Sequence, residues 1–180
     1  RRLYDQRIDD DGSQRSANRL GIRAGTELDL GEKLNGEISA GWLSESPDDA
    51  RLAAISGASV NADLKWSPER GTVIGLAGTT TVEGTTTPGE TGDLLYSGQL
   101  TAERRIRSDL TANAALGLGW RTYTGTDGHD MIMSAEAGLT WWLNRYVGLS
   151  TKARYEKLES NLPGRNYDSA SIFAGIKVQR

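Results

Sequence analysis

Apolar and polar residues alternate along most of this 180-residue chain, in stretches of about ten positions that each end in a turn. The clearest stretch is residues 19–30, where Leu20 and Ile22 occupy even positions while Arg23 and Glu27 occupy odd ones. Successive side chains of an extended strand point to opposite faces, so this pattern predicts one hydrocarbon face and one charged face. Such strands of about ten residues are typical of transmembrane β-barrels, whereas strands in soluble sheets are usually about five or six residues long.

Nine such stretches recur with the same two-faced pattern, at residues 19–30, 34–45, 58–66, 72–83, 94–106, 110–123, 131–141, 147–155 and 172–178. Within these nine stretches, Val82 and Leu94 are among the residues assigned to the apolar face. A tenth strand, short and poorly patterned, is expected at residues 1–8. Tight turns at residues 31–33, 67–71, 107–109 and 143–146 alternate with longer polar loops at 9–14, 47–56, 85–91, 124–130 and 160–166. Outer-membrane barrels combine short periplasmic turns with longer external loops. The sequence therefore predicts an all-β fold, an antiparallel up-and-down transmembrane β-barrel of about ten strands with both termini in the periplasm.

Composition fits one domain over residues 1–180 and excludes several classes of protein. No apolar run approaches the roughly 20 residues that a membrane helix needs, so any membrane crossing must use closed β-structure. The chain has no Cys, which excludes disulfides, thiol catalysis and thiolate metal sites. The net charge of −3 argues against a nucleic-acid partner. The chain opens on Arg1 and Arg2 without a Met, from which we expect a mature or trimmed chain that lacks upstream sequence.

The tryptophans give a second, independent indication of a membrane. Trp42 and Trp120 come late in outward-running strands, Trp66 and Trp141 end inward-running ones, and all four fall on the apolar face. Indole rings prefer the membrane–water interface, so these residues are predicted to form an outer and an inner girdle in the lipid bilayer. The alternative is a soluble ligand-binding barrel with the tryptophans in its core, which would leave most charges pointing outward. Arg104 also falls on the apolar face, near an inner turn, where its long side chain can reach the interface.

Three segments near the C-terminus carry a family resemblance: residues 141–149 (WWLNRYVGL), residues 155–164 (YEKLESNLPG) and the pair Tyr167-Asp168. They resemble the C-terminal end of a family of outer-membrane β-barrel porins of Gram-negative bacteria, and weaker likeness extends back to about residue 19. The resemblance implies an outer-membrane barrel, and such barrels are associated with export of envelope polysaccharide. Because members of the family are longer, the C-terminal part of a larger barrel, lacking N-terminal strands, is the alternative to a ten-stranded one. Residues 173–180 keep an aromatic-x-Gly element but end in Arg, where outer-membrane barrels usually end in an aromatic residue.

Charged residues on the polar faces of the strands are predicted to line the lumen. The basic ones are Arg19, Arg23, Lys65, Arg105, Arg121, Lys152, Arg154 and Lys177, and the acidic ones are Glu27, Asp29, Glu37, Asp63, Glu103, Glu136 and Glu156. Because selective pores use rings of one charge, this balance argues against strong ion selectivity. The charges could instead pair across strands and plug a ten-stranded barrel, since open channels appear nearer sixteen strands. Hydroxyl and amide groups could line a path for a hydroxyl-rich solute or serve as ordinary polar filler: Ser39, Asn61, Thr79, Ser97, Gln99, Asn113 and Ser134.

Residues with catalytic or metal-binding chemistry are few. His129 is the only histidine, and with Asp127 or Asp130 it could activate water or a serine, although these aspartates fit a loop equally well. The acidic runs at residues 9–12 and 47–49 offer oxygen ligands for Ca²⁺ but lack the EF-hand spacing. No phosphate loop, zinc motif or dinucleotide fingerprint occurs. We therefore predict a protein that is not an enzyme and has no cofactor.

The function predicted from these features is a pore or export conduit for polar solutes, including envelope polysaccharide, in the bacterial outer membrane. Its expected partners are the lipid bilayer, envelope polysaccharide and proteins of an export machinery. The alternative is a plugged, non-conducting barrel that acts as a structural or adhesive surface protein through its external loops.

Overall fold

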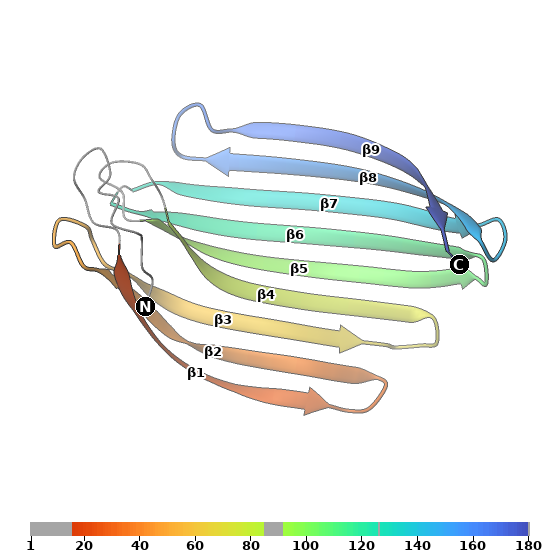
Figure 1. Cartoon of the computed structure of the whole chain (residues 1–180), viewed down its shortest axis with the longest axis horizontal. Coiled ribbons are helices and arrows are strands. Elements are labelled where there is room, and N and C mark those ends of the chain that lie inside the picture. The colour runs from red at the N-terminus through yellow and green to blue at the C-terminus, as the bar shows by residue number, and fades with distance from the viewer. Residues whose placement is uncertain (1–15, 85–91, 126, 180) are drawn as a thin grey trace.

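The computed structural model describes residues 16–84, 92–125 and 127–179, which form one sheet of nine antiparallel strands (Figure 1). The strands follow one another in chain order, and each is hydrogen-bonded to the next. They span 12 to 16 residues. Their bounds are β1 Ala17–Asp29, β2 Leu34–Pro47, β3 Ile55–Trp66, β4 Thr72–Gly84, β5 Gly92–Arg107, β6 Leu110–Thr124, β7 His129–Trp142, β8 Val147–Ser160 and β9 Tyr167–Val178.

The predicted all-β, up-and-down architecture is confirmed, and the sheet is consistent with the wall of a β-barrel. The sheet is not closed: within the described part of the chain, β1 and β9 each pair with a single strand and form its two edges (Figure 1). The tenth strand expected at residues 1–8 lies outside the described residues. No helix among the described residues is long and apolar enough to cross a membrane.

The tight turns join the strands at one end of the sheet, and the other connections join them at the opposite end (Figure 1). The connections at residues 48–54 and 161–166 are longer than the tight turns, as the sequence predicts, whereas the connection at residues 125–128 is no longer than the turn at residues 143–146. Local chemistry explains the turns. Gly31 has a φ of 66°, which favours glycine, and its N–H donates to Asp29 Oδ1 at 3.0 Å. Asn144 Oδ1 accepts the N–H groups of Tyr146 and Val147 at 2.8 and 3.0 Å. We call the strand ends joined by the tight turns the inner edge of the sheet and the opposite strand ends its outer edge, as distinct from the edge strands β1 and β9.

Several strands extend beyond the alternating pattern of the sequence. β3 begins at Ile55 rather than residue 58, and β9 begins at Tyr167 rather than residue 172, while β8 continues to Ser160. Backbone hydrogen bonds require only a partner strand, so the ladder continues where the side-chain alternation has ended. The connections near the outer edge are correspondingly shorter than predicted, at residues 48–54, 125–128 and 161–166.

The strand register gives the sheet one polar and one apolar face. Ile22 lies opposite Trp42 on the apolar face, whereas Arg23 lies opposite Gly41 on the polar face. Large side chains of the apolar face are exposed, with Ile22 at 75%. Exposed hydrocarbon over an extended surface marks a site of membrane or protein contact.

One region departs from this two-faced arrangement, at the outer end of β3 and β4. Residues 61–66 of β3 pair with residues 74–79 of β4, whereas residues 55–60 of β3 do not pair with β4. Leu43 and Ile55, from the polar side of β2 and β3, pack against Val82 and Leu94 in a buried cluster. Val82 and Leu94 lie on the apolar face that the sequence assigns to them. They are buried rather than exposed, because the interrupted pairing lets β3 contact β5.

Candidate functional site

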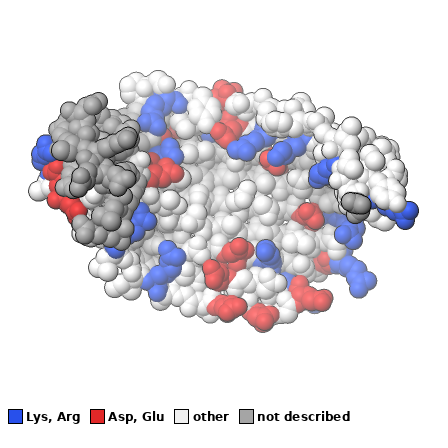
Figure 2. Space-filling view, in the orientation of Figure 1, with Lys and Arg blue, Asp and Glu red and all other residues white. Residues whose placement is uncertain are grey.

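The predicted lumen charges all lie on the polar face of the sheet, in register with one another. Glu27 lies opposite Glu37, Glu37 lies opposite Asp63, and Glu136 lies opposite Arg154. Basic and acidic side chains are interspersed over the sheet rather than separated by sign (Figure 2). That this face lines a water-filled lumen stays a prediction. The charges that share the face are Arg19, Arg23, Glu27, Asp29, Glu37, Asp63, Lys65, Glu103, Arg105, Arg121, Glu136, Lys152, Arg154, Glu156 and Lys177.

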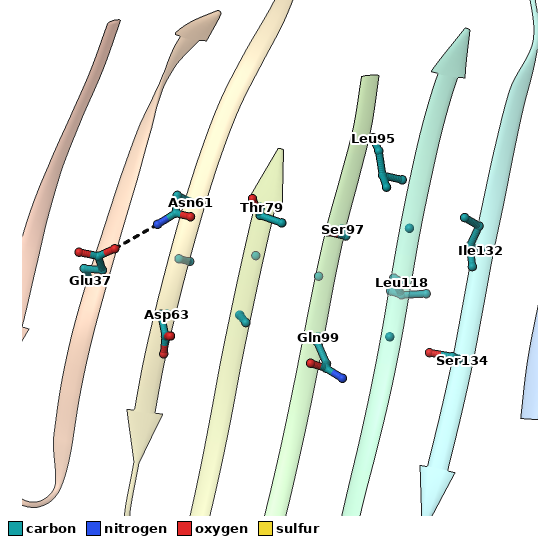
Figure 3. Close-up of a pocket in the computed structure, with 16 residues that line it drawn as sticks. Glu37, Asn61, Asp63, Thr79, Leu95, Ser97, Gln99, Leu118, Ile132 and Ser134 are labelled. Carbon is teal, nitrogen blue, oxygen red and sulfur yellow. Dashed lines mark hydrogen bonds between the residues drawn. The ribbon is translucent and has the colours of Figure 1, made fainter. Parts of the chain in front are cut away.

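Three carboxylates form an acidic row across β1, β2 and β3. Its members are Glu27, Glu37 and Asp63, and Glu37 Oε1 accepts a hydrogen bond from Asn61 Nδ2 at 3.1 Å (Figure 3). Like charges directly opposite one another in neighbouring strands repel. None of the three forms an ion pair with another described residue, so the row presents net negative charge on this part of the face.

Hydroxyl, amide and glycine positions occupy the middle of the polar face. Thr79, Ser97, Gln99 and Ser134 line a shallow depression of about 620 Å³ that extends over β2 to β7 (Figure 3). Glycine keeps the depression open, since a Cβ on Gly117 would lie 2.4 Å from Ser134 Oγ. Uncharged donors and acceptors of this kind can replace water around a hydroxyl-rich solute.

Some of the predicted lumen charges form ion pairs across or along strands. Lys152 Nζ lies 3.2 Å from Glu136 Oε2, and Arg154 Nη2 lies 2.6 Å from Glu156 Oε2. The plugged alternative requires such pairs throughout the face. Within the described ranges, however, several charges form no ion pair: Glu27, Glu37, Asp63, Lys65, Glu103 and Arg105.

An ion-pair cluster lies at the outer end of the polar face, where β4, β5, β6 and β7 meet. The Arg121 guanidinium lies 2.8 Å from Glu83, 2.7 Å from Asp93 and 3.7 Å from Asp130. Asp130 is fully buried, with 0% of its surface exposed. A carboxylate removed from water is costly unless it is paired, so Arg121 makes this burial possible.

The connection between β8 and β9 reaches back to this cluster through Arg165. The Arg165 guanidinium lies 3.0 Å from Asp130 Oδ2 and 4.8 Å from the centroid of the Tyr123 ring. Asn161 holds the same connection against β7, because its Oδ1 accepts the N–H of His129 at 2.8 Å. The β8–β9 connection is thus fixed against the outer ends of β6 and β7.

The sheet therefore combines a charged face, an exposed hydrocarbon face and connections of unequal length at its two edges. The family model described as Putative beta-barrel porin 2 matches residues 1–180. The chain belongs to this porin family. Membership is consistent with a pore role and an outer-membrane location, and it implies a non-enzymatic channel. No curated protein and no solved structure matches the chain.

The apolar face of this porin carries the tryptophans predicted to form the membrane girdles: Trp42, Trp66, Trp120 and Trp141. At the inner edge, Trp141 Nε1 donates to Asp109 Oδ2 in the neighbouring tight turn at 3.0 Å. Arg104 lies at the same edge, and its guanidinium pairs with Glu69 of another tight turn at 2.5 Å. Indole N–H and guanidinium groups that have polar partners at a strand end are typical of the membrane–water interface. The depth of these residues in a membrane stays a prediction.

The polar face of the porin also carries residues to which the sequence analysis assigns no role. Trp142 lies opposite Gly148, and Phe173 lies opposite Lys152. The alternation of side chains in β7 and β9 explains why Trp142 and Phe173 lie on the polar face, because each directly follows a residue of the apolar face. Arg165 was also missed, and no sequence pattern indicates it, since it lies in a connection between strands.

The candidate catalytic and metal-binding residues are not brought together. His129 lies on the apolar side, where its ring stacks on Trp120 with centroids 4.9 Å apart, while Asp130 lies on the polar side. In the acidic run at residues 47–49, Asp49 pairs with Arg51 at 2.7 Å. The run at residues 9–12 lies outside the described residues. The part of the chain that the structure describes holds no group of three acidic or histidine side chains suited to a metal ion.

Proposed function

We propose that this porin forms a pore for polar solutes in the outer membrane of Gram-negative bacteria, with envelope polysaccharide as its cargo. The observation that carries the proposal is the composition of the polar face. Hydroxyl, amide and glycine residues occupy most of its middle, together with Leu95 and Ile132. Charges of both signs surround them, and the opposite face exposes hydrocarbon. Such a sheet has one face suited to water and one suited to lipid.

The chemistry of the polar face favours uncharged, hydroxyl-rich solutes over ions. Strong ion selectivity needs a ring of charges of one sign. Here the pairs Lys152–Glu136 and Arg154–Glu156 place both signs side by side on β7 and β8. Ser97 and Gln99 supply donors and acceptors that carry no charge, which suits the hydroxyl groups of a glycan.

The proposal also gives the porin an orientation and partners. The apolar face contacts the lipid bilayer, with the inner edge and both termini in the periplasm. The tight turns at the inner edge support this orientation, because outer-membrane barrels have their short turns in the periplasm. Trp141 and Arg104 support a membrane–water interface at that edge, since their polar groups find partners in the tight turns. Proteins of an export machinery would deliver polysaccharide from the periplasmic side.

Single-channel recording tests the proposal. Folded protein, purified in detergent and selected by its heat-modifiable gel mobility, is inserted into a planar bilayer, and a neutral polysaccharide is then added. The expected result is stable conductance steps that the polysaccharide blocks from one side. Silence from folded, inserted protein would overturn the pore and favour the plugged barrel, while open steps indifferent to polysaccharide would overturn the cargo.

A further inference from the structure

Two aromatic rings lie among polar groups at the inner end of the polar face. Trp142 of β7 and Phe173 of β9 line a depression of about 660 Å³ together with Asn113, Glu136 and Lys152. This depression shares no lining residue with the central one that Figure 3 shows. The other tryptophans of the chain lie on the opposite face, so Trp142 has a different environment from all of them.

The Trp142 ring presents a face to the depression. A Cβ on Gly148 would lie 2.8 Å from Trp142 Cε3, 3.0 Å from Cδ2 and 3.2 Å from Cζ3. Because three ring atoms lie at similar distances, the indole packs face-on over Gly148, which leaves its second face toward the depression. Phe173 is 55% exposed, and the Lys152 ammonium lies 5.9 Å from the centroid of its ring.

The polar groups around the rings balance in charge. Lys152 pairs with Glu136 at 3.2 Å, and Lys177 Nζ donates to Thr140 Oγ1 at 3.2 Å. Glu103, also part of the lining, offsets the charge of Lys177. The depression therefore offers hydrogen-bond donors and acceptors without a net charge that would favour an ionic ligand.

We infer that this depression is a binding subsite for a neutral oligosaccharide, with Trp142 and Phe173 stacked on two separate sugar rings of one chain. The face of an aromatic ring carries partial negative charge and attracts the C–H groups that line one face of a pyranose. Pockets with aromatic walls and a few placed polar groups orient their ligands in this way. Lys152, on β8 opposite Phe173, hydrogen-bonds sugar hydroxyls beside that ring. The inference rests on the proposed function, because it names the class of cargo that the pore binds.

Calorimetric titration of the full chain, folded in detergent micelles, with cellohexaose tests the subsite. Trp142→Ala and Phe173→Ala should each weaken binding about tenfold, and Trp142→Phe should retain most of the affinity because a ring remains. Trp141→Ala is the matched control: the adjacent tryptophan faces the other side, so binding should be unchanged. Trp42→Ala serves as a second control should Trp141→Ala not fold, and heat-modifiable mobility confirms folding of each variant.

The outcomes are distinct. Absence of cellohexaose binding, or wild-type affinity in folded Trp142→Ala and Phe173→Ala, overturns the subsite. Tighter binding of hexagalacturonate than of cellohexaose overturns its preference for a neutral ligand. Conductance separates the subsite from the pore. Conductance steps without cellohexaose binding would support the pore and reject the subsite. Cellohexaose binding by a protein that does not conduct would support the subsite and reject the pore.

Discussion

The Tyr123 hydroxyl donates a 2.6 Å hydrogen bond to Asp130, the carboxylate that is fully buried at the outer end of the polar face. Arg165, from the connection between β8 and β9, approaches the same Oδ2 atom at 3.0 Å, and Arg121 lies 3.7 Å away. One buried carboxylate thus joins β6, β7 and the β8–β9 connection. Its charge is tolerated only while these partners surround it.

Replacing Asp130 by Asn should lower the free energy of unfolding by about 1–3 kcal/mol, because Tyr123 and Arg165 lose a charged acceptor. The loss is limited because Arg121 keeps two other carboxylate partners. Urea unfolding of protein embedded in lipid vesicles measures the change. Asp168→Asn, at an exposed position of β9, is the control and should be neutral. Equal stability of the two variants would show that Asp130 does not hold the outer end.

The two faces of β6 differ in what they should tolerate. Leu116 lies on the apolar face and is 56% exposed, so Leu116→Arg should cost about 2–4 kcal/mol if that face contacts lipid. Asn113 lies on the polar face, and Asn113→Arg should cost little. Urea midpoints of both variants in lipid vesicles give the comparison. Equal tolerance of the two arginines would contradict the assignment of the faces.

Local alternation predicts most of this fold because each strand carries its own two-faced pattern. Residues 19–30 alone distinguish the face of Ile22 from that of Arg23, and the register with β2 follows from the short turn between them. For the same reason, the alternation predicts correctly the face on which Trp141 and Glu136 lie. The lipid and lumen assignments of those faces stay predictions.

Long-range packing accounts for what the alternation misses. Leu94 is buried because the part of β3 that precedes Asn61 does not pair with β4 and β3 contacts β5 instead. No local sequence pattern encodes this contact. Gly57 makes room for that contact, since a Cβ there would lie 2.5 Å from Leu94 Cδ2. Arg165 was missed for a similar reason, because its partner Asp130 is 35 residues away in the chain.

Gly41 should be sensitive to a single added methyl group. A Cβ at this position would lie 1.9 Å from the carbonyl oxygen of Ile22, on the paired strand β1. The backbone cannot move aside without weakening the ladder, so Gly41→Ala should cost about 1–3 kcal/mol. Gly98→Ala is the matched control, since its nearest neighbour would be 3.9 Å away. Similar unfolding midpoints for both variants would contradict the close approach of β1 and β2.

The acidic row should give the pore a weak preference for cations over anions, well short of the strong selectivity that a ring of one charge would confer. Removing two of its charges with Glu37→Gln and Asp63→Asn should shift the reversal potential in a KCl gradient toward anions. Glu69→Gln removes a charge in an exposed tight turn, paired with Arg104, and should leave the reversal potential nearly unchanged. A shift of equal size in both variants would place the acidic row outside the conduction path.

The proposed pore depends on a polar face that lines a water-filled lumen. Because the chain contains no Cys, a single introduced Cys can be modified selectively, and this gives the most direct test. Gln99 and Leu100 are neighbours on β5 with opposite orientation, Gln99 in the central depression and Leu100 on the exposed apolar face. Each is replaced singly by Cys, and single-channel current is recorded while a charged, membrane-impermeant thiol reagent is added. The current through the Gln99→Cys pore should fall on modification, while that through the Leu100→Cys pore should not change. A current that responds at Leu100 and not at Gln99 would contradict the proposed lumen.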